Sequence, residues 1–354
     1  MTKARTGAQL HTRRSILISA SGIAAASLVG APNVLRAQER EIVVGGAASH
    51  LAWMQKIVIP HFQEKHKVKV TFEGARSMVN LEKMANNKGK QYLSVVQMDD
   101  PVLILAIEQD LLERMDPKTI PNLTQLKPGT IHQDGYWANY LQPWQGVAFN
   151  SDAKKQGVPS WEDLWDPSNK GRVILPSLQN TEGVANLFMA AHLETGKPMA
   201  EAVMEIDAGF ERLARMKPNL LTIYTQMPQA FSLLEQGEAW IVASAFSSFV
   251  LPRKAEGGVP IDLAAPKEGI FASPSGIAKV KGGPQPDLAD LYVNELLSVE
   301  IQSQLVEPTF SLPTNAQVPA TAGMPKVEVF PTDWGYVAKN RKAWIEKWDR
   351  LMAL

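Results

Sequence analysis

Trp137 to Asn150 read WANYLQPWQGVAFN, and this stretch decides the organisation of the chain. The pattern predicts one extended segment, long enough to leave one folded lobe and enter another. We therefore place the first crossing between two lobes here. The first lobe is predicted to comprise residues 38–143 and 270–354, and the second lobe residues 144–269. The segment from Pro260 to Pro266 is expected to carry the chain back.

The sequence before the crossing alternates strand-like and helix-like pieces. Glu41 to Gly46 is a β-branched run that ends in glycines, Leu51 to Lys65 has apolar residues at helical spacing, and Lys67 to Phe72 alternates as a strand does. A helical stretch from Met78 to Lys88 then leads to the apolar run from Tyr92 to Val96. This order predicts an α/β fold in which mixed, mostly parallel sheets carry helices on both faces.

Similar pieces follow the crossing. We expect strands at 172–175 and 240–243, and helices at 181–192, 288–297, 299–306 and 336–351. Trp344 and Trp348 lie on one face of the last helix, which predicts packing against a lobe.

The first residues of the chain predict an export signal. Arg13 and Arg14 precede the apolar stretch from Ile16 to Val29, which is too short to cross a bilayer, and a cleavage site follows Ala37. We predict that residues 1–37 are a twin-arginine signal peptide, read by the twin-arginine export machinery, and that the mature protein works in the periplasm. The alternative is a disordered basic N-terminus.

Composition excludes several classes of protein. Loss of residues 1–37 would remove five basic residues and no acidic one, leaving a net charge of about −5 and no basic stripe for a nucleic acid. The chain contains no cysteine, so disulfides, thiolate metal sites and a lipid-attachment cysteine are absent. No stretch after the signal has 18 consecutive apolar residues, which argues against a membrane span.

Six short motifs resemble the successive landmarks of the periplasmic solute-binding proteins of bacterial ABC importers. The likeness is to family 1 of these proteins, in the branch of the spermidine/putrescine and ferric-ion binders. The motifs are Gly146 to Asn150, Trp161 to Pro167, Gly171 to Pro176, Leu233 to Glu238, Pro266 to Gly269, and Gly276 to Lys279. The resemblance implies a type II periplasmic-binding-protein fold with two lobes and a hinge of two crossing strands. It also implies a monomer that closes on one small solute and delivers it to a membrane permease and its ATPase.

Candidate ligand residues lie in the loops that follow the predicted strands, because parallel sheets gather binding groups at the carboxyl ends of their strands. A carrier that closes on its solute also needs contacts from both lobes. We predict contacts from Ser49, His50, Arg76, Asp99, Gln142, Trp144, Ser177, Thr181, Tyr224, Ser244, Ser273 and Ser275.

These residue types favour a small polar organic solute, and some of them would suit an anionic group; the charge of the solute stays open. Asn180 or Thr181 would cap a helix whose free N–H groups bind oxyanions, and Arg76 offers the planar fork that suits a carboxylate. Each residue also has a purely structural interpretation. Arg76 would then pair with Glu73 or Glu82, and Trp144 would belong to a core. Asp99 and Asp100, which precede Pro101, would cap the helix expected from Val102 to Gln109.

Departures from the relatives argue against the two best-known ligands of the branch. The resemblance implies, for polyamine binders, aromatic residues after the first strand, an acid after the strand at 172–176, and a tryptophan and an aspartate after the Pro-Lys-Glu-Gly landmark. Those places here hold Gly45 to His50, Ser177, and Ala272 to Ser275, so polyamine is the alternative solute. Ferric binders use a tyrosine pair, whereas Tyr224 stands alone.

An exported hydrolase and a solute sensor remain the alternatives from other classes. The chain has no Gly-x-Ser-x-Gly, Gly-x-Gly-x-x-Gly, Walker or His-Glu-x-x-His motif, and its histidines lack metal-ligand spacing. We therefore expect no catalytic residues, cofactor or metal. A triad assembled from distant residues leaves no such motif, which is why the hydrolase stays open.

Overall fold

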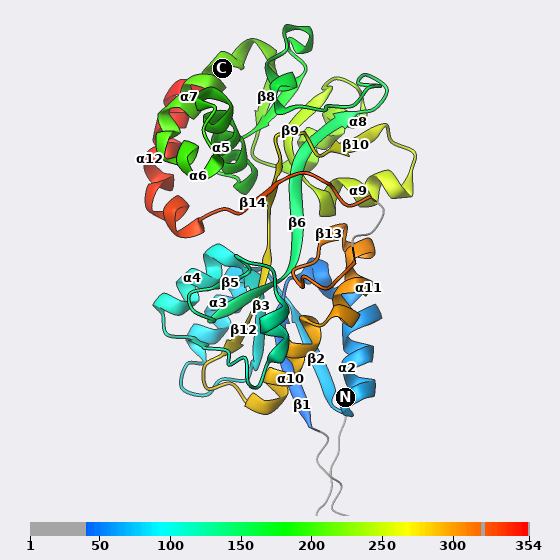
Figure 1. Ribbon diagram of the computed structural model, residues 1–354, viewed down its shortest axis with the longest axis vertical. Helices are drawn as coiled ribbons and strands as arrows, with labels where there is room; N and C mark the ends of the chain where they lie inside the picture. The colour runs from blue at the N-terminus through cyan, green and yellow to red at the C-terminus, as the bar shows by residue number, and fades with distance from the viewer. Residues whose placement is uncertain (1–39, 320–322, 353–354) are drawn as a thin grey trace, which may run out of the picture. The chain divides into compact units, whose positions relative to one another are not determined.

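The computed structural model describes residues 40–319 and 323–352 (Figure 1). The predicted signal peptide, residues 1–37, lies outside these ranges. Strand β6 (Trp137–Asn150) is a single strand of 14 residues, as predicted. Its first part pairs with β12 (Ser275–Val280), and its last part pairs with β9 (Ile241–Phe246) and β10 (Ile261–Ala264). The strand therefore runs from one group of partners into another.

The first lobe is built around the predicted β-α-β opening. Strands β1 (Glu41–Gly46), β2 (Lys69–Gly74) and β3 (Val95–Asp99) are parallel and extend the sheet in the order β2-β1-β3-β12-β6. Val95 and Val96 point into two different buried clusters, because successive residues of a strand face opposite sides. Helices cover both faces: α2 (Ile59–His66), α3 (Ser77–Asn86), α4 (Asp100–Glu108), α10 (Pro286–Leu296) and α11 (Val299–Thr309).

The second lobe repeats this arrangement. Strands β7 (Val173–Pro176) and β8 (Leu220–Tyr224) continue the sheet beyond β9, all three parallel. Helix α5 (Thr181–Thr195) is buried over ten consecutive residues, which explains its lack of an apolar stripe. Further helices of this lobe include α7 (Ile206–Arg215), α8 (Met227–Glu235) and α9 (Ser247–Glu256).

The last helix corrects the predicted lobe limits. Residues 270–354 were expected in the first lobe, but α12 (Trp334–Met352) packs in the core of the second lobe through Trp344 and Trp348. Lys347 also pairs with Asp207 of α7, at 2.7 Å. The reason is a further crossing: β14 (Val329–Phe330) pairs with β11 (Ile270–Ala272) and leads the chain to the second lobe. The other predicted limits stay a prediction.

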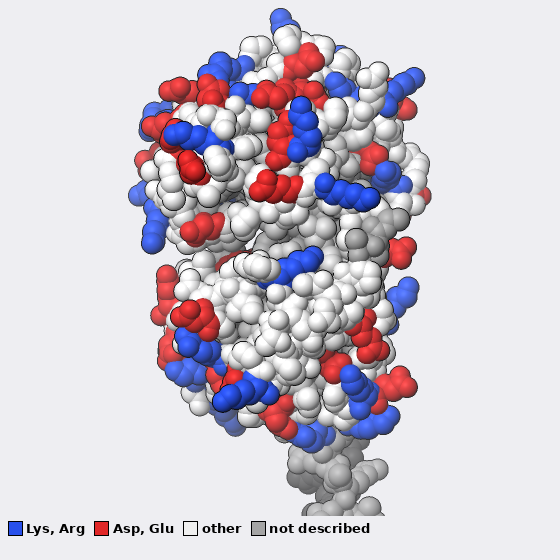
Figure 2. Space-filling view, viewed as in Figure 1, with Lys and Arg blue, Asp and Glu red and all other residues white. Residues whose placement is uncertain are grey.

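Two features of the surface bear on the class of protein. Within the described ranges, no helix is both long and apolar enough to cross a membrane. Basic and acidic side chains are interspersed over the face drawn in Figure 2, so this face offers no continuous basic area for phosphates.

Candidate functional site

The strand ends of the two lobes face each other across the middle of β6. Strand β3 ends at Asp99, which lies opposite Ser275, and Ser275 lies opposite Leu141 of β6. Strand β9 runs the other way and ends at Phe246, opposite Gln145 of β6. Leu141 and Gln145 are four residues apart, or about 14 Å along a strand. The loops that follow the parallel strands of both lobes therefore border the same stretch of β6.

An aromatic cluster lies behind the first strand end. Atoms Nδ1 of His50 and Oη of Tyr140 are 3.0 Å apart, and the rings of His50 and Trp53 have centroids 4.8 Å apart. Burial lowers the pKa of His50 to about 4, so its imidazole is neutral at pH 7. Sequence reasoning missed Trp53. It follows His50 by three residues, and this spacing on a helix places two side chains on the same face. Ser49 is exposed in the same turn.

Arg76 and Asp99 lie at the ends of the neighbouring strands. Ser77 donates its hydroxyl to Oδ2 of Asp99 at 2.9 Å and receives the backbone N–H of Asp99 at 3.2 Å. Arg76 is exposed, and no ion pair joins it to another described residue. The pairing with Glu73 that the structural interpretation offered is wrong, because Glu73 binds Lys83 at 2.6 Å.

Asp100 points away from Asp99, into the lobe. Its Oδ1 accepts hydrogen bonds from Trp137 Nε1 at 2.9 Å and Asn139 Nδ2 at 2.8 Å, and its Oδ2 lies 3.8 Å from Nε2 of His132. Burial raises the pKa of Asp100 to about 6, against the partial opposition of His132 and the two donors. Asp99 occupies the N-cap position of α4, as the structural interpretation expects, but neither aspartate caps the helix through a side-chain hydrogen bond.

The raised pKa of Asp100 gives the folded protein a testable pH dependence. Because the folded state holds the proton up to about pH 6 and the unfolded state only to about pH 4, Asp100 stabilises the fold at low pH and this contribution is lost as pH rises between those values. We expect Asp100→Asn to gain stability relative to the native protein, by on the order of 2 kcal/mol, between pH 4 and pH 7. Urea unfolding across this range measures the difference. Asp349→Asn, on an exposed residue, is the control, and a pH-independent difference would contradict the assignment.

The loop between β7 and α5 forms the second lobe's side of the site. Asn180 has the backbone of a helix cap, but its side chain does not cap α5 and instead donates to the carbonyl of Thr225 at 3.4 Å. The hydroxyl of Ser177 accepts the N–H of Gln179 at 3.2 Å. The predicted side-chain cap is therefore absent, and Thr181 begins the helix at a partly exposed position.

A buried acid that sequence reasoning missed follows this loop. Glu182 is 5% exposed, and its Oε1 lies 3.3 Å from the hydroxyl of Tyr224. Burial raises the pKa of Glu182, and the Tyr224 hydroxyl and the charge of Arg341 partly offset this shift. Arg341, on α12, donates to the carbonyl of Gln179 at 2.7 Å. Glu182 is visible in the sequence as a helix-start residue, whereas nothing local indicated that α12 would bring an arginine here.

The remaining predicted residues lie where the chain crosses. Gln142 pairs with β13 (Ser311–Leu312), and Ser275 stands beside Asp99 in the sheet. Ser273 accepts a hydrogen bond from Gln145 Nε2 at 3.3 Å. Trp144 is 5% exposed and belongs to a core cluster. Ser244 is fully buried, and its hydroxyl donates a hydrogen bond to Oε1 of Gln145. Both residues therefore lie in the packing beneath the site. No cluster of three potential metal ligands occurs within the described ranges.

Comparison with known proteins identifies the family of this chain. Residues 93–340 match the family model of the bacterial extracellular solute-binding proteins. A Salmonella typhimurium periplasmic protein named for binding 2-aminoethylphosphonate is 25% identical over 79% of this chain and 81% of its own length. The γ-aminobutyric acid-binding protein of Pseudomonas aeruginosa is 25% identical over 73% of this chain and 72% of its own.

The fold is also that of solved proteins of this kind. A crystal structure described as an extracellular solute-binding protein from Bordetella parapertussis superposes with a TM-score of 0.78, over 88% of this chain and 99% of that one, at 22% identity. The two-lobed α/β architecture expected from the sequence is thereby confirmed. Because the family model spans well over half of the chain, this protein belongs to the bacterial extracellular solute-binding proteins, which capture small solutes for ABC transporters.

Proposed function

We propose that this protein captures a small zwitterion, with an ammonium group at one end and a phosphonate or carboxylate at the other, between the facing strand ends of its lobes. It hands the solute unchanged to a membrane permease and its ATPase. Its periplasmic relatives and the predicted twin-arginine signal support work in the periplasm, and we propose that it acts there as a monomer.

The observation that carries the proposal is that an acidic and a basic side chain meet at the loop between β7 and α5. Glu182 is a buried carboxylate in the first turn of α5, and Arg341 holds the loop just before that turn. A buried carboxylate is costly unless a cation compensates it, and an ammonium group would do so. The guanidinium offers the opposite recognition, since its N–H fork matches phosphonate and carboxylate oxygens.

The first lobe has groups of both kinds as well. Trp53 and neutral His50 present aromatic surface, which favours a cation, while Asp99 and Arg76 supply one charge of each sign. The sequence argument against amines found no acid and no aromatic side chain in the matching places. Glu182 and Trp53 supply both from the helices that follow those loops, and so they support an ammonium-bearing solute.

Polyamine remains the alternative solute. A polyamine has no group for Arg76 or Arg341, and bringing several positive charges beside two arginines is unfavourable. An exported hydrolase and a solute sensor remain the alternatives from other classes. Recovery of the bound solute chemically unchanged distinguishes a carrier from a hydrolase, and uptake lost on deletion of the gene distinguishes a carrier from a sensor.

A panel of matched solutes tests the proposal. We expect 2-aminoethylphosphonate or 4-aminobutyrate to raise the melting temperature of the purified protein by about 5 °C at one hundred times the Kd, because binding then adds about 2.7 kcal/mol to the free energy of unfolding. Ethylphosphonate and butyrate lack the amine, and putrescine lacks the acid, so each should give a much smaller shift. Calorimetry on the best solute gives the affinity.

Two results would overturn the proposal. A shift with putrescine or spermidine alone would establish the polyamine alternative. Equal shifts with ethylphosphonate and 2-aminoethylphosphonate would show that the ammonium group is not recognised.

A further inference from the structure

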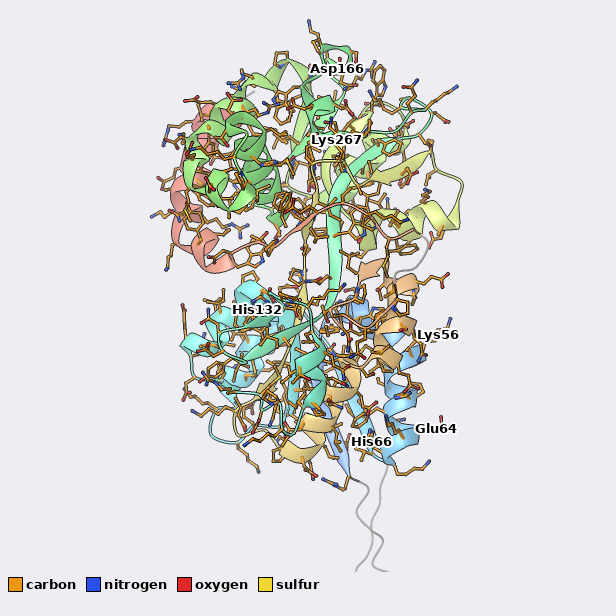
Figure 3. All side chains as sticks on the ribbon, viewed as in Figure 1. Lys56, Glu64, His66, His132, Asp166 and Lys267 are labelled. Atoms are coloured by element: carbon orange, nitrogen blue, oxygen red, sulfur yellow. The ribbon has the colours of Figure 1, made fainter. Side chains whose placement is uncertain are left out.

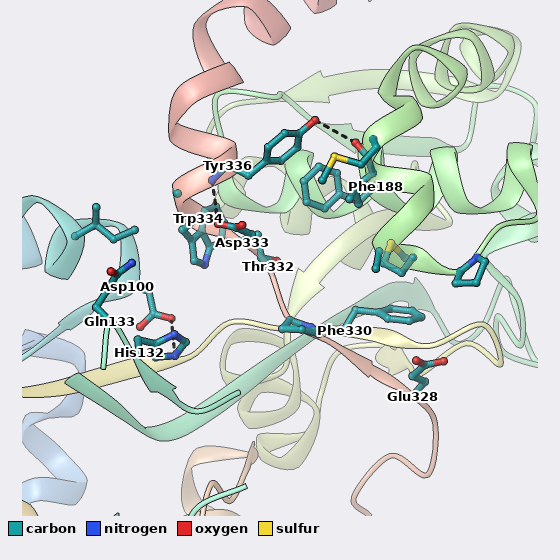
Figure 4. Close-up of a pocket in the computed structure, with 18 of the residues that line it drawn as sticks. Asp100, His132, Gln133, Phe188, Glu328, Phe330, Thr332, Asp333, Trp334 and Tyr336 are labelled. Carbon is teal, nitrogen blue, oxygen red and sulfur yellow. Dashed lines mark hydrogen bonds and ion pairs between the residues drawn. The ribbon is translucent and has the colours of Figure 1, made fainter. Parts of the chain in front are cut away.

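A pocket of about 660 Å³ lies beside the crossing strands (Figure 4). Its first-lobe wall comes from α4 and the turn after β5 (Ile131–His132), and its second-lobe wall comes from α5, the short α6 (Met199–Ala202) and the segment 328–336. Its volume is that of a site for a small organic molecule. His132, on the first-lobe wall, lies at the end of that lobe nearest the second lobe (Figure 3).

This pocket is not part of the solute site described above. None of the twelve predicted ligand residues lines it, and neither do Trp53, Glu182 or Arg341. The two adjacent aspartates mark the separation, because Asp99 binds Ser77 at the strand end whereas Asp100 binds Trp137 on the pocket side.

The lining combines aromatic rings with acids. Phe330 and Trp334 line the pocket as buried residues, Tyr336 lines it at a partly exposed position, and His132 stacks on Trp137 with ring centroids 4.9 Å apart. Carboxylates come from Asp100, Glu328 and Asp333, while the lining includes no lysine or arginine. A cation is the guest that such walls favour, since it is attracted both to carboxylates and to the faces of aromatic rings.

The acids differ in what they already bind. Asp100 accepts hydrogen bonds from the side chains of Trp137 and Asn139. Asp333 accepts a hydrogen bond from the backbone N–H of Tyr336 at the start of α12. Glu328 is exposed, and no ion pair or side-chain hydrogen bond joins it to another described residue. Glu328 is therefore the acid most available to a guest. Met204, 66% exposed at the same pocket, adds apolar surface for the body of that guest.

From these observations we propose a second ligand site, in this pocket, for an organic cation with an apolar body. The guest contacts both lobes at once, so its affinity differs between arrangements of the lobes, and it would couple to solute binding through that difference. The site is independent of the identity of the solute.

Calorimetry with benzyltrimethylammonium as the probe tests the site, with benzyl alcohol and phenylacetate as neutral and anionic controls. We expect the cation to bind at least tenfold more tightly than either control. Ala200 lines the pocket at an exposed position, so Ala200→Lys adds a positive charge with little effect on packing. This variant should weaken binding of the cation at least tenfold, and the matched Ala200→Gln should weaken that binding less than twofold. Glu328→Gln should weaken binding of the cation about threefold. Glu211→Gln, at an exposed position that does not line the pocket, should leave that binding unchanged.

Three results would overturn the proposal: no binding of the probe, equal affinity for benzyl alcohol, or an Ala200→Lys variant that binds as the native protein does. Competition with 2-aminoethylphosphonate separates this site from the solute site. Simultaneous binding of both compounds supports two sites, and strict mutual exclusion would show that the probe occupies the solute site instead. Melting temperatures of the variants establish that they are folded.

Discussion

Replacement of Gly183 by alanine is expected to abolish solute binding and to lower the free energy of unfolding by about 3 kcal/mol. Gly183 lies in the first turn of α5, directly beneath the loop that forms the second lobe's side of the site. A Cβ atom there would lie 2.3 Å from the carbonyl oxygen of Ser177 and 2.7 Å from Cα of Leu178. Both are backbone atoms, so no side-chain rotation relieves the clash and the loop must move away from the helix.

The expected displacement would separate the groups that we assign to the solute. Glu182 belongs to the helix, whereas Arg341 is fixed to the loop through the carbonyl of Gln179, so moving the loop changes the distance between their charges. Calorimetry measures the loss of binding, and urea unfolding measures the stability. Gly89→Ala is the matched control, because a Cβ atom at Gly89 meets nothing within 4 Å. Native affinity in Gly183→Ala would show that this loop takes no part in the site.

Local patterns predicted the elements that position the site. Strand β6 could be predicted because its whole length is extended, and the opening β-α-β unit because its apolar residues change from a period of two to helical spacing. The ends of elements are less visible in the sequence: the apolar run begins at Tyr92, whereas β3 begins at Val95, because Leu93 is buried without belonging to the strand.

The residues that sequence reasoning missed depend on long-range packing. Arg341 reaches the loop before α5 only because α12 returns to the second lobe, and an amphipathic helix does not indicate which apolar surface it will cover. Glu182 was overlooked for a different reason. Acids are common in the first turn of a helix, and its burial results from the surrounding fold rather than from its neighbours in the sequence.

Replacement of Glu182 by glutamine is expected to weaken the binding of an ammonium-bearing solute about one hundredfold. The affinity for the same solute without its amine should change little. The hundredfold corresponds to about 2.7 kcal/mol, within the range of a charge-assisted hydrogen bond in a buried site. Because burial raises the pKa of Glu182, the neutral glutamine relieves a desolvation cost, and the variant should be at least as stable as the native protein at pH 7. Lost affinity with retained stability is therefore the signature of a direct contact.

Calorimetry with 2-aminoethylphosphonate and ethylphosphonate, on the native protein and on Glu182→Gln, forms a double comparison that isolates the ammonium group. Tyr224→Phe removes the hydroxyl 3.3 Å from the carboxylate without changing the charge, so it should reduce affinity only a few-fold through the orientation of Glu182. Glu211→Gln, on an exposed residue of α7, is the control for charge alone. Equal losses for both phosphonates would mean that Glu182 shapes the loop rather than binding the amine, and unchanged affinity for both would exclude it from the site.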